Sequence, residues 1–149
     1  GANIVFGCDI VLAATTAKFV QSFAKVGLIP DAGGTYHLAQ ILGPLRAKAW
    51  AMTAAPITAQ TAQDWGLVWQ CFEPGALLEA AQQMTADLAK GATLGLAQTK
   101  HAIHKAGQID LEAHMALEAE IQRACGQSAD YLEGVTAFLD KRPAKYSGS

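Results

Sequence analysis

The sequence predicts a mixed α/β fold whose C-terminal half is helical. Short apolar runs with β-branched residues, which are typical of strands, occur only before Pro74. From Pro74 onward, apolar residues recur every three or four positions, as on one face of an amphipathic helix. Hydrophobic residues make up 51% of the 149 residues and charged residues only 16%. This length and composition indicate one ordinary folded domain and exclude a disordered tail.

The N-terminal segment contains one helical and two strand-like patterns. GANIVFG has the apolar spacing of a helix, while IVLAA and KFV, separated by a turn-like ATTA, predict two short strands. Strands this short do not form a stable sheet alone, so another part of the chain or a partner is expected to pair with them. Because the helical pattern starts without a cap, we expect residues 1–149 to be a fragment of a larger protein.

A glycine-rich loop follows at Val26–Thr35, VGLIPDAGGT. Its three glycines and Pro30 are incompatible with regular structure and indicate a tight loop. A helical pattern then covers Thr35–Leu42. Pro44 is expected just inside a second helix, where its missing N–H costs nothing.

One short helix and one strand complete the first half of the chain. Thr58 is expected to begin the helix and Gly66 to end it, and the following LVWQCF alternates like a strand. Four helices are expected after Pro74, of which the first covers Ala76–Lys90. The other three are expected to be capped by Thr93, Asp110 and Ser128, and the last to be stopped by Arg142-Pro143.

Charge and cysteine content exclude several classes of function. Eleven basic and thirteen acidic residues give a formal charge of -2, so there is no basic field to hold nucleic acid or an anionic membrane. No stretch approaches the ~20 apolar residues of a membrane span. Three widely spaced cysteines without a CxxC pair predict neither a zinc site nor a disulfide framework, and a cytoplasmic location is expected.

The histidines do not form a metal-binding pattern. His101 and His104 lie three residues apart on one predicted helix, with no carboxylate at a matching spacing. We expect them on the helix surface or in ordinary packing. His37 follows the glycine-rich loop by one helical turn, and packing is its expected role as well.

Asp31 is the candidate for chemistry within the loop. Its DAGG segment lacks the pattern of a nucleotide-binding loop, but paired glycines let the backbone pass close to a ligand before a helix N-terminus. From spacing alone, Asp31 is more often a turn or capping residue than an acid/base at a ligand pocket. The spacing alone therefore favours the turn or capping role.

Several strings in one order carry a resemblance to a known family. These are GANIVFGCDIVLA, FVQSFAKVGLIPDAGGT, ITAQTAQDWGLV and EGVTAFLDKR, and together they resemble the enoyl-CoA hydratase/isomerase, or crotonase, family over essentially all of the chain. The resemblance implies the C-terminal portion of a crotonase (ClpP-like) spiral of ββα units. Residues 1–75 would then carry the active-site loop. Residues 76–149 would form a helical region for trimerisation and CoA contact.

Two departures from the family pattern favour an isomerase. Hydratases of this family use two glutamates, and the resemblance aligns these with Asn3 and Phe23. Asn is not a general base and Phe has no proton to give, whereas Asp31 alone can take and return one proton. IPDAGGT and DWGLVW are most similar to members that isomerise a ring-epoxide CoA thioester of phenylacetate catabolism. The alternatives are an enoyl-CoA hydratase, a Δ3,Δ2-enoyl-CoA isomerase and a non-catalytic oligomerisation fragment.

The resemblance also implies roles for individual residues. Asp31 would be the catalytic acid/base, and Asn3, Ser22 and Phe23 would line the acyl pocket. No metal and no separate cofactor are expected, because coenzyme A enters as part of the acyl-CoA substrate. Both N–H donors for the thioester oxygen would precede Gly1, so residues 1–149 alone are expected to be inactive.

The C-terminal residues are expected to contact CoA and neighbouring subunits. Phe138 and Lys141, three residues apart, would share one helical face and bind the nucleotide end of CoA by the family resemblance. From spacing alone, Phe138 would pack in the core and Lys141 would favour a helix C-terminus. The low charge and apolar C-terminal helices predict a homotrimer or hexamer.

Overall fold

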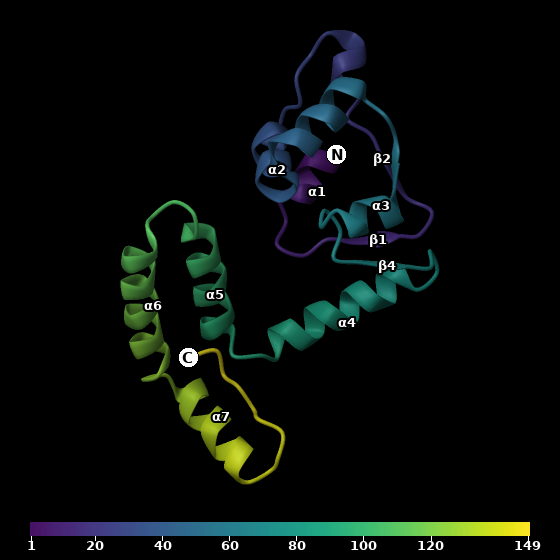
Figure 1. Ribbon diagram of the computed structural model, residues 1–149. Coiled ribbons are helices and arrows are strands. Elements are labelled where there is room, and N and C mark those ends of the chain that lie inside the picture. Colours follow the sequence, from purple (N-terminus) through teal and green to yellow (C-terminus); the bar gives the residue numbers. More distant parts are fainter. The chain divides into compact units, whose positions relative to one another are not determined.

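The computed structural model describes residues 1–149 and divides into two compact units, Gly1–Gln82 and Gln83–Ser149 (Figure 1). The division falls within helix α4, whereas the sequence analysis placed a boundary between residues 75 and 76. The elements in chain order are α1 (Ala2–Phe6), β1 (Leu12–Ala14), β2 (Lys18–Phe19), the 3-10 helix η1 (Ser22–Val26), α2 (Gly34–Thr53), β3 (Ile57–Thr58), α3 (Ala59–Asp64), β4 (Gln70–Phe72), α4 (Leu77–Ala89), α5 (Thr93–Lys105), α6 (Leu111–Cys125) and α7 (Ala129–Leu139).

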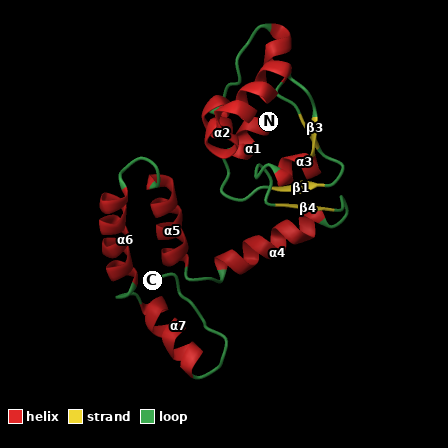
Figure 2. Cartoon of the chain, in the orientation of Figure 1, coloured by secondary structure: helices red, strands yellow, loops and turns green.

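The strands form two separate pairs, both in the first unit (Figure 2). Strand β1 pairs in parallel with β4, with Leu12 opposite Gln70, and β2 pairs antiparallel with β3. The parallel pair needs a long crossover connection, which contains α2 and α3. The two predicted N-terminal strands therefore find their partners later in the same chain.

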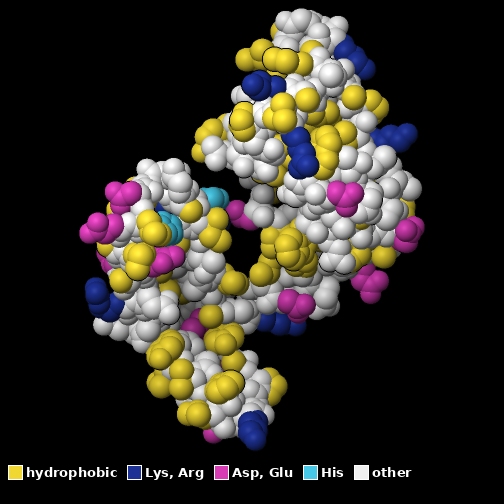
Figure 3. All heavy atoms as spheres, in the orientation of Figure 1, with side chains coloured by type: hydrophobic (Ala, Val, Ile, Leu, Met, Phe, Trp, Pro, Cys, Tyr) yellow, Lys and Arg dark blue, Asp and Glu magenta, His cyan; other side chains and the backbone are white.

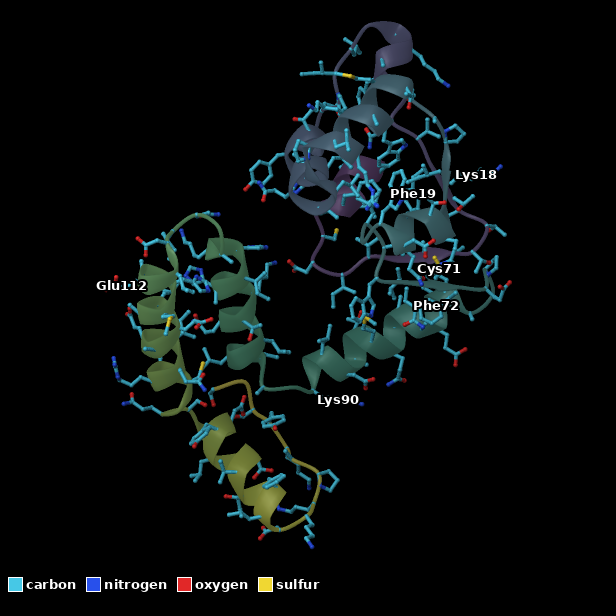
Figure 4. The ribbon with its side chains drawn as sticks, viewed as in Figure 1. Lys18, Phe19, Cys71, Phe72, Lys90 and Glu112 are labelled. Carbon is cyan, nitrogen blue, oxygen red and sulfur yellow. The ribbon has the colours of Figure 1, made fainter.

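Aromatic side chains hold α1 against α2 in the core of the first unit. Phe6 of α1 is 4% exposed, and its ring lies 6.1 Å from that of Trp50 in α2 and 5.4 Å from that of Phe19 in β2. Phe19 points into this unit, whereas the neighbouring Lys18 points away from it (Figure 4). Because edge-to-face and tilted aromatic pairs fix ring positions, this packing sets where α1 lies relative to the C-terminal segment of α2.

Helix α2 is two helices joined at Gly43, as the sequence predicted. Gly43 has φ 71° and ψ 164°, a conformation that interrupts the helix and that glycine adopts without steric cost. Pro44 then occupies the start of the second helical segment, where no N–H is required.

Three of the four predicted helix caps are confirmed. Thr58, Asp110 and Ser128 each accept a hydrogen bond from the backbone N–H three residues on, at 3.1, 2.8 and 3.0 Å. The prediction for Thr93 is wrong, because Ala92 is the N-cap of α5 and Thr93 is already helical. The Thr93 hydroxyl lies instead against the backbone of Gly148 in the C-terminal tail.

In the second unit, α5 and α6 lie side by side, and the tail after α7 returns along that helix (Figure 1). Asp130 accepts hydrogen bonds from the N–H groups of Ser147 at 2.7 Å and Gly148 at 3.0 Å. Arg142 donates two hydrogen bonds to Glu133, at 2.7 and 2.9 Å. These two carboxylates hold the tail on α7.

Helix α7 ends earlier than the sequence predicted. Its last residue is Leu139, and Lys141 adopts a left-handed conformation with φ 54°. The prediction that Phe138 and Lys141 share a helical face is therefore wrong, because the helix ends between them. The left-handed Lys141 lets the N–H of Arg142 donate to the carbonyl of Ala137 at 3.0 Å, which closes the end of the helix.

None of the helices is both long and apolar enough to cross a membrane.

Candidate functional site

The loop before α2 has an unusual backbone conformation at Ala32 and Gly33. Both residues are left-handed, with φ 47° and φ 75°, and Gly33 is the N-cap of α2 without a side-chain cap. Glycine adopts this conformation readily, whereas alanine is strained there. Asp31 thus lies in the turn just before the cap, and its side chain does not cap the helix.

The buried side chain of Asn3 holds this turn. Asn3 is 4% exposed in α1, and its Nδ2 donates to the carbonyl oxygen of Asp31 at 3.0 Å. Its Oδ1 accepts a hydrogen bond of 2.7 Å from Nε2 of Gln21, the residue just before η1. One asparagine therefore connects α1, η1 and the Asp31 loop, three segments that are separated in the sequence.

The second glycine of DAGG leaves room for that amide. A Cβ atom on Gly34 would overlap the side-chain amide of Asn3. The two glycines therefore serve different purposes, because Gly33 supplies a left-handed conformation and Gly34 a close approach.

The carboxylate of Asp31 is left free by this arrangement. Its side chain is exposed, and its carbonyl, rather than its carboxylate, makes the hydrogen bonds that fix the loop. A carboxylate on a fixed backbone, with no ion pair to hold its charge, is suited to proton transfer.

Of the predicted acyl-pocket residues, Asn3 contacts this loop directly, and Ser22 and Phe23 follow Gln21, which contacts Asn3. Ser22 is exposed and Phe23 half-buried in η1, directly after Gln21. Gln21 itself was missed in the sequence analysis, because nothing in the string FVQSF distinguishes a buried glutamine from an exposed one.

His37 packs under the same loop. Cβ atoms built on Gly7 and Gly33 would lie 3.2 and 3.1 Å from its Nε2, so the ring rests against two glycine backbones. Its ring also meets that of Tyr36 edge-on at 5.7 Å. This is the packing role expected from the sequence.

The remaining histidines and cysteines provide no set of metal ligands. No group of three or more His, Cys, Asp or Glu side chains is placed to hold a metal ion. The three cysteines are free thiols. Burial and the nearby Asp64 carboxylate both raise the pKa of Cys71, which lowers its reactivity as a thiolate.

The sequence model of one family matches the whole chain. Its description is enoyl-CoA hydratase/isomerase, and the match covers residues 1–149. The chain belongs to the enoyl-CoA hydratase/isomerase family. The family predicted from the sequence strings is therefore confirmed.

Relatives within the enoyl-CoA hydratase/isomerase family have more than one named activity. The chain is 44% identical over 148 residues to a 1,2-epoxyphenylacetyl-CoA isomerase of Escherichia coli, covering 99% of this chain and 56% of the relative. It is 41% identical over 148 residues to a probable enoyl-CoA hydratase of Rhodobacter capsulatus, covering 99% of this chain and 58% of that protein. The chain spans a little over half the length of these relatives.

A solved structure of the family confirms the predicted fold class. The enoyl-CoA hydratase from Bacillus anthracis superposes with a TM-score of 0.94 at 31% sequence identity, covering 100% of this chain and 58% of that one. The chain therefore has a partial crotonase fold.

Phe138 and Lys141 lie in the second unit. Phe138 is 82% exposed and lines an open groove of about 530 Å³ with Tyr131 and Tyr146, so it does not pack in the core. Lys141 is exposed in the turn after α7. Both side chains are accessible to a ligand, although they are not presented by the same helical face.

Proposed function

We propose that the protein is an acyl-CoA isomerase in which Asp31 moves a proton at the carbon next to the thioester. The main support for this proposal is the exposed carboxylate of Asp31, which lies on a loop whose backbone is held by Asn3. The resemblance aligns the two hydratase glutamates with Asn3 and Phe23, and the amide of Asn3 is already engaged with the loop and Gln21. One carboxylate supports proton removal and return, whereas activation of water uses a further acid or base.

In the proposed reaction, the Asp31 carboxylate accepts the C2 proton of a CoA thioester. The electron pair of the C–H bond moves toward the thioester carbonyl and gives an enolate. The enolate rearranges, and the protonated carboxyl returns its proton. Backbone N–H donors around the thioester oxygen commonly stabilise such an oxyanion more than any other group. The family resemblance implies donors outside residues 1–149, so we expect these residues alone to be inactive.

The proposed substrate is 1,2-epoxyphenylacetyl-CoA. The support is the 44% identity with the isomerase of that name. Hydration is the second candidate, because the Rhodobacter capsulatus relative carries the name of a probable enoyl-CoA hydratase.

Two substrates separate these candidates in the full-length protein. An isomerase should convert 1,2-epoxyphenylacetyl-CoA to oxepin-CoA, an isomer of unchanged mass, and should leave crotonyl-CoA unhydrated. Rapid formation of 3-hydroxybutyryl-CoA from crotonyl-CoA would contradict the isomerase proposal. Isothermal titration with a CoA thioester tests the non-catalytic alternative, since an assembly module gives no binding heat.

The second unit is proposed to bind CoA and neighbouring subunits. The exposed ring of Phe138 offers a surface for adenine, and the ammonium of Lys141 offers charge for the CoA phosphates. A homotrimer or hexamer is supported by apolar residues that α7 exposes (Figure 3), namely Tyr131, Leu132, Val135, Phe138 and Leu139.

A further inference from the structure

Gln21 is a fully buried polar residue at the base of the Asp31 loop. It is 0% exposed, and its Nε2 donates the 2.7 Å hydrogen bond to Oδ1 of Asn3. Asn3 in turn donates to the Asp31 carbonyl at 3.0 Å. The three residues form a chain of two hydrogen bonds. Gln21 and Asn3 are 18 residues apart in the sequence, and Asn3 and Asp31 are 28 residues apart.

The carbonyl of Asp31 fixes the direction of both hydrogen bonds. A carbonyl oxygen only accepts, so Asn3 must present its NH₂ group to Asp31 and its Oδ1 to Gln21. Gln21 must then present its own NH₂ group, because the opposite orientation would place two acceptors face to face. Only an amide, or another donor of this length, fits at position 21.

The same orientation leaves Oε1 of Gln21 without a hydrogen-bond partner. An unpaired buried acceptor costs at least as much free energy as a neutral hydrogen bond contributes. The interactions of Gln21 within this chain therefore offer little net stabilisation of the fold. The Gln21 donor instead fixes the position of the Asn3 amide. The Asn3 amide in turn fixes the position of the Asp31 carbonyl.

Asp31 lies next to a strained residue that depends on such support. Its carbonyl also accepts a 2.7 Å hydrogen bond from the N–H of Gly34, so the turn closes on this one oxygen. Ala32, between them, is left-handed with φ 47°. A strained backbone of this kind persists only while its surroundings hold it, so loss of the amide chain would let the turn relax and move Asp31.

We propose that Gln21 is a positioning residue for proton transfer by Asp31 and acts through Asn3. The inference rests on the proposed function of Asp31. Displacement of a general base by about 1 Å can lower a rate by about 10²-fold, while the CoA contacts proposed for Phe138 and Lys141 do not include Gln21 or Asn3. Gln21 therefore affects kcat and leaves KM nearly unchanged.

The test is Gln21→Met in the full-length protein, with Gln63→Met as the matched control. Methionine keeps the length of the side chain and removes the donor. Gln63 also uses its amide within the first unit, where its Oε1 accepts from the N–H of Cys71 at 2.6 Å, but it contacts β4 rather than the Asp31 loop. Gln21→Met removes the unpaired acceptor Oε1 of Gln21 and leaves Oδ1 of Asn3 unpaired in its place. Because the number of unpaired acceptors stays the same, Tm should fall by no more than about 5 °C.

Gln21→Met should lower kcat by about 10-fold or more and change KM by less than about twofold. Its Gly34 amide should exchange with deuterium at least about tenfold faster than in the wild type. Gln63→Met should change neither kcat nor the exchange rate of the Gly34 amide. A Gln21→Met protein that fails to fold would overturn the proposal, because Gln21 would then be a structural residue. Wild-type kcat or wild-type exchange at Gly34 would also overturn it.

Failure of the proposed function gives a different pattern. If Asp31→Asn turns over like the wild type, Asp31 is not the base, and the positioning role of Gln21 falls with it. If Asp31→Asn is impaired while Gln21→Met behaves like Gln63→Met, only the role of Gln21 is wrong.

Discussion

At the scale of single residues, the close approach of Asn3 to Gly34 dictates the second glycine of DAGG. A methyl group on Gly34 would overlap the Asn3 amide, so Gly34→Ala must displace the Asn3 side chain or the loop that it holds. Overpacking of this kind costs about 1–3 kcal/mol of unfolding free energy. The cost should be measured by urea unfolding, in the wild type and in an Asn3→Ala background.

In the Asn3→Ala background the overlap is gone, so Gly34→Ala should be neutral or stabilising, because alanine favours a helix more than glycine does. An equal cost in both backgrounds would show that the Asn3 amide does not restrict position 34.

The sequence identified Asp31 but not the residues that hold it. Asp31 stands out because glycine-rich loops are local patterns, and the family resemblance then supplied a role. The bonds from Asn3 to Asp31 and Gln21 depend on aromatic packing of α1 against α2, which no local pattern encodes. The resemblance assigned Asn3 to the acyl pocket, and the structure adds that its amide fixes the loop.

At the scale of elements, the tail on α7 should be sensitive to acid. Hydrogen bonds from Arg142 and from the N–H of Lys145 lower the pKa of Glu133 to about 2, from an ordinary value of 4.5. A carboxylate whose pKa is lower in the folded state stabilises it fully above the ordinary value. That contribution is lost as pH falls toward the lowered value.

The tail should therefore stay ordered at pH 5 and become mobile between about pH 4.5 and 2, which ¹⁵N relaxation of residues 143–149 would measure. Glu133→Gln should weaken the contact with Arg142 and reduce the change in tail mobility over this range. A tail equally ordered at pH 5 and at pH 2 in the wild type would contradict the role of Glu133.

Elements whose ends are set locally were predicted well, and those set by distant partners were not. Thr58, Asp110 and Ser128 cap helices through bonds to residues three positions away. The Thr93 hydroxyl lies instead against the returning tail, which is distant in the sequence. Strand pairing shows the same contrast, because β1, β2 and β4 were predicted from the sequence, whereas β3 and both pairings were not.

At the scale of the whole molecule, the exposed apolar face of α7 should mediate self-association. Leu132 is 67% exposed on this face. Leu132→Glu places a charge there and should shift the full-length protein from a trimer or hexamer to smaller species, as measured by light scattering at micromolar concentration. Circular dichroism should remain unchanged, since the side chain is outside the core. Gln127→Glu, which adds the same charge at an exposed position before α7, is the control.

A wild-type protein that scatters as a monomer would contradict assembly through α7. An oligomer that survives Leu132→Glu intact would place the interface elsewhere.

One carboxylate, Asp31, is proposed to carry the proton, and the kcat of Asp31→Asn shows whether it does. The substitution keeps the shape of the side chain and both hydrogen bonds that the Asp31 carbonyl accepts, from Nδ2 of Asn3 and the N–H of Gly34, while removing the base. With 1,2-epoxyphenylacetyl-CoA and the full-length protein, kcat should fall by at least the ~10²-fold typical of losing a general base. Asp64→Asn, at an exposed aspartate on α3, should retain wild-type kcat. An Asp31→Asn protein whose kcat stays within a few-fold of the wild type would contradict the claim.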